Sequence, residues 1–216
     1  MQNIKNISQW YVQSGKKYQA ADYLLYLIAY HTSPVLEKNK PAVVLSFSNE
    51  RLRRLNDIWE EYKDRIPSSA DYQYLELRQT KERTTVLFYY PQFLESILKD
   101  KSVVHYLFSC GYRKQLTLET ALSDLKSRCQ NGCPHEIGIF LGIPLTDVLG
   151  FIENSGKKAL GEGYWKVYHD LDAKLLLFSL YQQAKEAFRQ FVMTGKAPEE
   201  YLNMRARTCA TLASGE

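Results

Sequence analysis

The chain has 216 residues, of which 45% are hydrophobic and 24% are charged, with 11 glycines and 7 prolines. This composition excludes a disordered or low-complexity chain, and the length is sufficient to bury the core of a single domain, 1–216. The formal net charge of +4 is spread along the chain and forms no basic block, so it disfavours nucleic-acid binding.

The N-terminal region predicts the compartment. Residues 1–19 are polar, and the apolar run after them, AADYLLYLIAY, contains an aspartate and is shorter than the roughly 20 residues of a membrane span. We therefore expect no signal peptide and no membrane segment. Four cysteines without an export signal indicate reduced thiols. The sequence thus predicts a soluble, cytoplasmic protein.

The first half of the chain alternates helix and strand. We expect a buried helix over 18–31, ending before the Thr-Ser-Pro that follows, and a buried strand over 42–48. Apolar residues at helical spacing predict an amphipathic helix within 49–65: Leu52, Leu55, Trp59 and Tyr62. Two β-rich runs separated by a charged turn predict an antiparallel hairpin over 71–90, which Pro91 ends.

The second half is mainly helical. Three short helices are expected in succession over 92–131, with Gly111 as a C-cap and Thr117 as an N-cap. An αα-hairpin at 134–154, a short strand at 164–168, a long C-terminal helix to about Met193 and a frayed tail at 205–216 follow. The predicted class is therefore α+β, a small antiparallel sheet packed with helices, and 117–160 could form a helical subdomain.

The hairpin at 134–154 resembles a DNA-binding helix-turn-helix in outline. Its second helix, PLTDVLGFIEN, begins at Pro144, carries Asp147 and Glu153, and contains no lysine or arginine. Phosphate repulsion therefore disfavours insertion into a DNA groove. We interpret the segment as two packed helices, and its charge disfavours nucleic-acid binding.

The segment CQNGCPH contains possible metal ligands. Cys129, Cys133 and His135 have the side-chain types of a zinc site but supply fewer than four ligands, and Cys-Pro also occurs in haem-responsive motifs. Free thiols at a helix end explain the same pattern. We therefore assign no metal and keep these three residues as weak candidates.

Two further groups of polar residues are candidate ligand contacts. His135 and Glu136 are suitable for acid-base chemistry, although a carboxylate at a helix N-terminus also complements the helix dipole. In GYWKVYHD, strand alternation places Tyr164, Lys166 and Tyr168 on one face and Trp165 with its neighbour Val167 in the core. The first face could line a pocket in which Lys166 contacts an anion.

The run PHEIGIFLGIPLTDVLGFIENSGK with the later GYWKVYHD closely resembles the signature of an uncharacterised bacterial family of unknown function that is common in anaerobes. The resemblance extends upstream to HTSPVLEKNKPAVVLSFS and covers most of 25–195. It implies no established activity, only a redox- or iron-related context. Thr32 and Glu162 stand where members carry cysteine, and Ile143 replaces a tyrosine, which puts a shared cysteine-based metal site in doubt.

Three functional hypotheses follow. The first is a binding or accessory protein for a small anionic ligand or a redox or iron-related cofactor, with a cleft near 135–168 and a possible redox protein partner. Its candidate contacts are His135, Glu136, Asn154, Tyr164, Lys166 and Tyr168. The second is an enzyme that uses His135 and Glu136 for proton transfer. The third is a nucleic-acid or protein-interaction module, which would need a positive stripe that includes Arg51, Arg53 and Arg54. The identity of the cofactor and the oligomeric state stay open.

Overall fold

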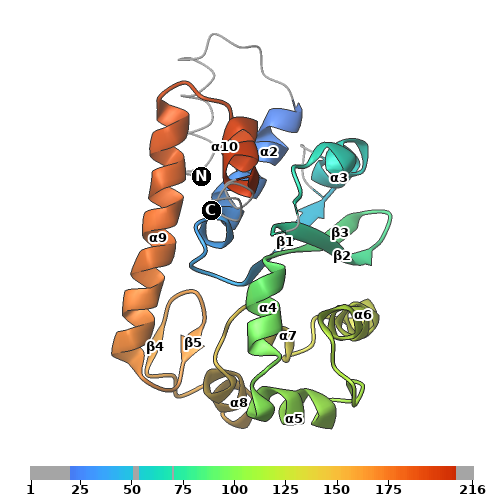
Figure 1. The fold of residues 1–216 in the computed structure, drawn as a ribbon, viewed down its shortest axis with the longest axis vertical. Coiled ribbons are helices and arrows are strands. Elements are labelled where there is room, and N and C mark those ends of the chain that lie inside the picture. Colours follow the sequence, from blue (N-terminus) through green and yellow to red (C-terminus); the bar gives the residue numbers. More distant parts are fainter. Residues whose placement is uncertain (1–19, 51–53, 70, 208–216) are drawn as a thin grey trace, which may run out of the picture.

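The computed structural model describes residues 20–50, 54–69 and 71–207 (Figure 1). Its sheet has three antiparallel strands in the order β1-β3-β2, with β1 at Ala42–Ser48, β2 at Gln73–Gln79 and β3 at Arg83–Tyr89. Tyr89 at the end of β3 lies opposite both Ala42 and Gln73. Together with the helices around it, this sheet confirms the predicted α+β class and the hairpin within 71–90.

The sheet lies between two layers of helices, and these layers bury both faces of β3. Val86 and Phe88 join a core cluster with helices of one layer, and Leu87 and Tyr89 join a second cluster with helices of the other. The first layer contains α2 (Ala20–Leu36), α3 (Leu55–Tyr62) and α10 (Pro198–Arg207). The second contains α4 (Pro91–Ile97), α5 (Lys101–Ser109), α6 (Leu118–Arg128), α7 (Ile137–Phe140) and α8 (Leu145–Glu153). Figure 1 shows the sheet between α2 with α10 on one side and α5 to α8 on the other.

Helix α2 continues past its predicted end at residue 31 and includes Pro34. Proline lacks an N–H, so the carbonyl of Tyr30 loses the donor that a helix would normally supply. The Ser33 hydroxyl donates to this carbonyl at 2.9 Å. The prediction of an end before residue 32 was therefore wrong, because a neighbouring side chain replaces the missing backbone hydrogen bond.

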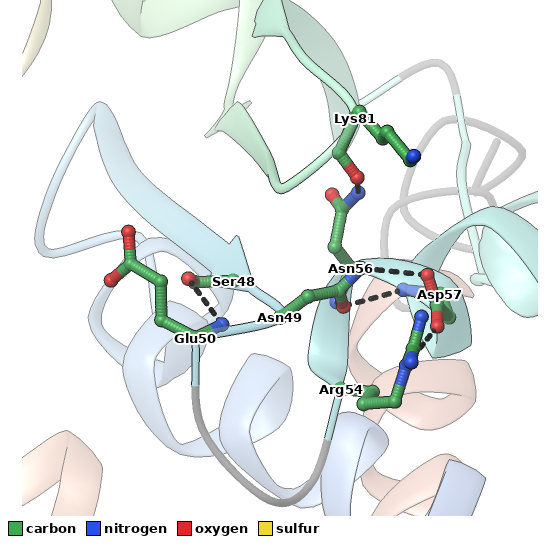
Figure 2. A network of polar contacts seen from close by, with 7 residues as sticks. All are labelled: Ser48, Asn49, Glu50, Arg54, Asn56, Asp57 and Lys81. Carbon is green, nitrogen blue, oxygen red and sulfur yellow. Dashed lines mark hydrogen bonds and ion pairs between the residues drawn. The ribbon is translucent and has the colours of Figure 1, made fainter.

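Helix α3 begins at Leu55, later than the pattern within 49–65 indicated, and residues 51–53 lie outside the described part of the chain. Asn49 caps the helix from a distance: its Oδ1 accepts from the backbone N–H groups of Asn56 and Asp57 at 3.1 and 3.2 Å. Arg54 donates to Asp57 at 2.5 Å, and the Asn56 amide donates to the Lys81 carbonyl (Figure 2). This network joins the end of β1 to α3 and the β2–β3 turn. A short 3₁₀ turn, η1 (Lys63–Arg65), follows α3.

The predicted caps of the second layer are present. Gly111 follows α5 with a φ of 95°, and the Thr117 hydroxyl accepts from the N–H of Thr120 at the start of α6. A 3₁₀ turn, η2 (Cys129–Asn131), leads to α7, which has only one helical turn. The expected αα-hairpin at 134–154 therefore has a short first arm. The segment 117–160 contributes to the same core cluster as the sheet.

A two-stranded hairpin leads into the longest helix. The run predicted as one strand at 164–168 contains only β5 (Lys166–Val167), which pairs antiparallel with β4 (Gly161–Glu162) just before that run. Helix α9 (Leu171–Met193) follows and is capped by Asp170, and Figure 1 shows it along one side of the molecule. Phe178 near its start packs with Trp165, whereas Phe188 near its end joins the cluster of α2. Helix α9 therefore connects the hairpin with the first layer.

Helix α10 was not predicted. Its Tyr201 and Leu202 are buried in the first core cluster, and the helix runs to Arg207, into the range 205–216 where we expect a frayed tail. The rest of that tail, 208–216, lies outside the described residues. None of the described helices is both long and apolar enough to cross a membrane.

Candidate functional site

A pocket of about 410 Å³ lies between α7 and α8 on one side and the β4–β5 hairpin on the other. Its volume falls within the range of about 300–1,000 Å³ that is typical of small-molecule sites. The walls are mainly apolar and aromatic: Ile137, Leu141, Ile143, Val148, Phe151 and Trp165. Polar side chains from both walls complete it: Cys133, His135, Asp147, Glu162, Tyr164 and Lys166. The pocket therefore combines an apolar surface with a few polar groups.

The close approach of the hairpin to α8 depends on Gly150. A Cβ at this position would lie 2.6 Å from the Cβ and Cγ of Tyr168, which is closer than non-bonded carbon atoms approach. The missing side chain lets the Tyr168 ring rest on the helix backbone. One wall of the pocket is thereby held against the other.

Asp147 provides the polar link between the same two elements. Its side chain is fully buried, and one carboxylate oxygen accepts from the Trp165 indole N–H at 2.9 Å. The other oxygen accepts from the backbone N–H groups of Tyr168 and His169 at 2.8 and 3.0 Å. Three donors replace the water that burial removes from the carboxylate, so Asp147 fixes β5 and the indole against α8.

His135 and Lys166 both line this pocket, from opposite walls. His135 is exposed, and its ring centroid lies 5.5 Å from that of Phe151. Lys166 donates to the Gly156 carbonyl at 2.8 Å, which holds the ammonium group in place. An ammonium group has three donors, so Lys166 can also donate to a ligand.

Glu136 is directed elsewhere. It is 4% exposed, pairs with Arg128 at the end of α6, and does not line the pocket. The Arg128 guanidinium also lies 5.5 Å from the centroid of the Tyr112 ring. Burial, followed by the charge of Glu136, raises the pKa of the Tyr112 hydroxyl. Adjacent in sequence, His135 and Glu136 thus have separate surroundings.

The other candidate residues have structural contacts. The Asn154 amide donates to the Gly150 carbonyl at 2.8 Å at the end of α8. Tyr168 packs on Gly150, and its hydroxyl is buried without a hydrogen-bond partner in the described part of the chain. Tyr164 lines the pocket with its neighbour Trp165. Of these three residues, only Tyr164 contributes directly to the pocket wall.

The cysteines near the pocket do not form a metal centre among the described residues, where no group of three or more His, Cys, Asp or Glu side chains could hold an ion. Cys129 is buried, and this burial, followed by the charge of Cys133, raises the pKa of its thiol to about 11. Burial also raises the pKa of the Cys133 thiol. Both thiols are therefore protonated at neutral pH in the metal-free protein, and a metal would have to displace these protons to bind.

Two residues important to the geometry were not identified as site residues from the sequence. Asp147 lies outside the apolar stripe of α8, which consists of Leu145, Val148, Leu149 and Ile152, so helical periodicity alone places it at the surface. Phe151 lies on the same helix and lines the pocket, although the stripe of α8 did not include it. The sequence signal for Asp147 was its proximity along the chain to GYWKVY. A buried carboxylate needs hydrogen-bond donors, and Trp165 in that segment supplies one.

The fold is of the α+β class, and the volume of its pocket falls in the range of small-molecule sites. The family described as "Protein of unknown function (DUF3793)" matches residues 28–202, and the chain belongs to this family. The match includes both walls of the pocket. No curated protein and no solved structure matches the chain.

Proposed function

We propose that this protein is a cytoplasmic binding protein for a small organic anion with an apolar or aromatic body, a class that includes organic redox cofactors. The observation that carries the proposal is the convergence of His135 and Lys166, from different elements, on one largely apolar pocket. The aromatic walls would bury the body of the ligand, and Lys166 would donate to its acidic group. Glu162 at the exposed rim offers an acceptor for a ligand N–H or O–H.

The surroundings of Lys166 support the anionic class. Its ammonium group is held by the Gly156 carbonyl, and none of the ion pairs in the described residues involves it. Among the described residues, no carboxylate therefore competes with a ligand for the ammonium group of Lys166. A binding role also agrees with the separate surroundings of Glu136, since Arg128 already engages the carboxylate that proton transfer with His135 would use.

Native mass spectrometry of the protein purified anaerobically from its own host tests the proposal. We expect a bound organic mass that Lys166→Met and Phe151→Ala each reduce by at least about tenfold in occupancy, because they remove the anion contact and an aromatic wall. Lys157→Met is the matched control, since it removes an exposed lysine outside the pocket. A bound mass that is equally retained by all three variants, or no bound mass in the wild type, would contradict the proposal.

A further inference from the structure

A second group of polar side chains lies outside the pocket, where the end of α2 and the loop after it meet α9 and the β4–β5 turn. We call it the cationic cluster: Lys40, Lys185 and Arg189, with the rings of Tyr30, Tyr164 and Tyr181. The Lys40 ammonium lies 5.3 Å from the centroid of the Tyr181 ring and 5.8 Å from that of Tyr164. The Lys185 ammonium lies 4.5 Å from the Tyr164 centroid. Two lysines from distant parts of the chain thus contact the same tyrosine.

The backbone after α2 fixes the position of Lys40. The Pro34 carbonyl accepts from the N–H groups of Asn39 and Lys40 at 2.9 and 3.0 Å, which closes the end of the helix. Lys38 adopts a φ of 58° within this turn. The lysine is consequently directed by an ordered helix end, and Figure 1 shows this loop running from α2 towards β1.

The charges of the two lysines are not balanced by carboxylates. Lys40 is only 9% exposed, and neither Lys40 nor Lys185 has an ion pair among the described residues. Arg189 is different, because it pairs with Glu186 at 2.8 Å and donates to the Tyr30 hydroxyl at 2.6 Å. Burying a charge without a partner is unfavourable. The cluster therefore has an excess of two positive charges.

The titration behaviour of the cluster agrees with this excess. Burial, followed by the charge of Lys185, lowers the pKa of Lys40 to about 8. Burial and the nearby Arg189 lower the pKa of Lys185. His31, on α2, has its pKa lowered to about 4 by burial and by Lys185, so it is neutral at pH 7 and adds no charge. Lys40 still carries most of its charge at neutral pH.

Tyr164, whose ring both lysines contact, also carries a neutral donor. Its hydroxyl is buried and has no hydrogen-bond partner in the part of the chain that the structure describes. Burial, followed by the neighbouring Tyr30, raises its pKa, so the hydroxyl keeps its proton and can donate. A buried donor without an acceptor is rare in folded proteins. An acceptor with negative charge would satisfy both the hydroxyl and the lysines.

We propose that Lys40, Lys185 and Tyr164 form a binding site for a phosphate group. A phosphate carries about −1.5 to −2 charges at neutral pH, which matches the two uncompensated lysines. Lysine binds phosphate as a point charge, and a tyrosine O–H adds a direct hydrogen bond. Half-buried Lys185 keeps the cluster within reach of solvent. This site is distinct from the pocket, although Tyr164 borders both.

Phosphate binding can be measured by ³¹P NMR titration and by the thermal shift of the protein, with sodium chloride at equal ionic strength as the reference. We expect inorganic phosphate to raise the Tm of the wild type above the chloride value. Lys185→Met and Lys40→Met should each weaken phosphate binding by about tenfold or more, and Tyr164→Phe by several-fold. Without phosphate, we expect the Lys40→Met protein to be at least as stable as the wild type, because the substitution removes an unpaired buried charge.

Lys174→Met is the matched control. It removes a lysine of the same helix, eleven residues earlier and about 16 Å along the helix axis, and should leave phosphate affinity unchanged. A phosphate effect no larger than that of chloride would overturn the proposal, as would an equal loss in the Lys174→Met protein. A marked loss of stability in the phosphate-free Lys40→Met protein, with unchanged phosphate affinity in the Lys185→Met protein, would show instead that the cations are structural.

Two further experiments identify the source of the phosphate group and distinguish the cationic cluster from the pocket. Ribose 5-phosphate that binds more tightly than inorganic phosphate would identify a phosphorylated small molecule as the ligand, and equal or weaker binding would identify free phosphate. Phosphate affinity should persist in the Lys166→Met protein, which tests the pocket alone. If the Lys166→Met protein lost phosphate binding and the Lys185→Met protein kept it, the cationic cluster would be refuted as a separate site.

Discussion

Asp147 is the residue on whose carboxylate the geometry of the pocket depends most directly. Asp147→Ala leaves the Trp165 indole N–H and two backbone N–H groups without their acceptor. We expect the free energy of unfolding to fall by about 3 kcal/mol, because each buried donor left unpaired costs about 1–3 kcal/mol and the site relaxes in part. Urea unfolding measures the change.

The control for this substitution is Glu153→Ala, which removes an exposed carboxylate from the same helix. Surface changes of this kind usually alter stability by less than about 0.5 kcal/mol. A similar effect of the two substitutions would mean that the three hydrogen bonds of Asp147 contribute little to holding the hairpin.

His31 makes the stability depend on pH. Its pKa is lowered from 6.5 to about 4 in the folded protein, first by burial and then by Lys185. Because the folded pKa lies below the unfolded one, the unfolded chain binds a proton more readily between these values. Protonation therefore favours unfolding, so the stability is complete above pH 6.5 and decreases as the pH falls towards 4.

We expect His31→Gln to make the loss of stability between pH 7 and pH 4.5 smaller by on the order of 2 kcal/mol. Urea unfolding at several pH values measures this slope, and His105→Gln, at an exposed histidine, is the control. Identical slopes for the wild type and the His31→Gln protein would disprove the effect.

At the scale of single elements, α2 shows how a side chain allows a helix to pass a proline. Ser33→Ala removes the donor to the Tyr30 carbonyl, and we expect it to cost about 1–2 kcal/mol in the wild type. In a Pro34→Ala background the new backbone N–H can donate to the same carbonyl, so the cost should be small. The double-mutant cycle should give a coupling of about 1 kcal/mol, measured by urea unfolding.

Equal costs of Ser33→Ala in the two backgrounds would contradict this explanation. The cycle is informative because both substitutions act on one carbonyl, and a general effect of serine on the helix would appear in both backgrounds. The same comparison would show why the predicted helix end at residue 31 was wrong, since proline stops a helix only where its lost hydrogen bond is not replaced.

Other elements were predictable to different extents. The strands at 42–48 and within 71–90 follow from β-branched runs bounded by turn residues, and the N-cap at Thr117 follows from a local side-chain hydrogen bond. Such features depend on neighbours in sequence. The sequence EEYLNMRAR of α10 has a weak apolar pattern, and its Tyr201 and Leu202 become buried only against α2 and α9. A helix that is stabilised mainly by tertiary packing leaves little trace in local sequence.

At the scale of the whole molecule, the sheet separates two cores while α9 connects the first layer of helices to the β4–β5 hairpin. Tyr181 packs with Trp165 and Phe178 beside the hairpin. Phe188, two turns later on the same helix, lies in the first core cluster. Lys185 lies between them and faces the cationic cluster. The long helix therefore positions the proposed phosphate site with reference to both the hairpin and the first layer.

The candidate residues of the pocket show which placements the sequence could predict and which it could not. Strand alternation correctly placed Trp165 and Val167 in the core, because side chains on a strand point alternately to its two faces. The neighbours His135 and Glu136 could not be separated in this way, since the residue that engages Glu136 is Arg128, which precedes it on another helix. Whether a polar side chain faces a pocket or an ion pair depends on the element that packs opposite.

The sequence by itself determined the α+β class, most strand and helix positions, several caps and membership of the family, because these depend on residue type, on periodicity and on a long linear signature. Only the tertiary structure decided that Asp147 is a buried acceptor, that His135 and Lys166 line one pocket, and that Lys40 meets Lys185 at Tyr164. These are contacts between residues far apart in the chain. Their energies depend on burial and on the partner available, and neither quantity is encoded in local pattern.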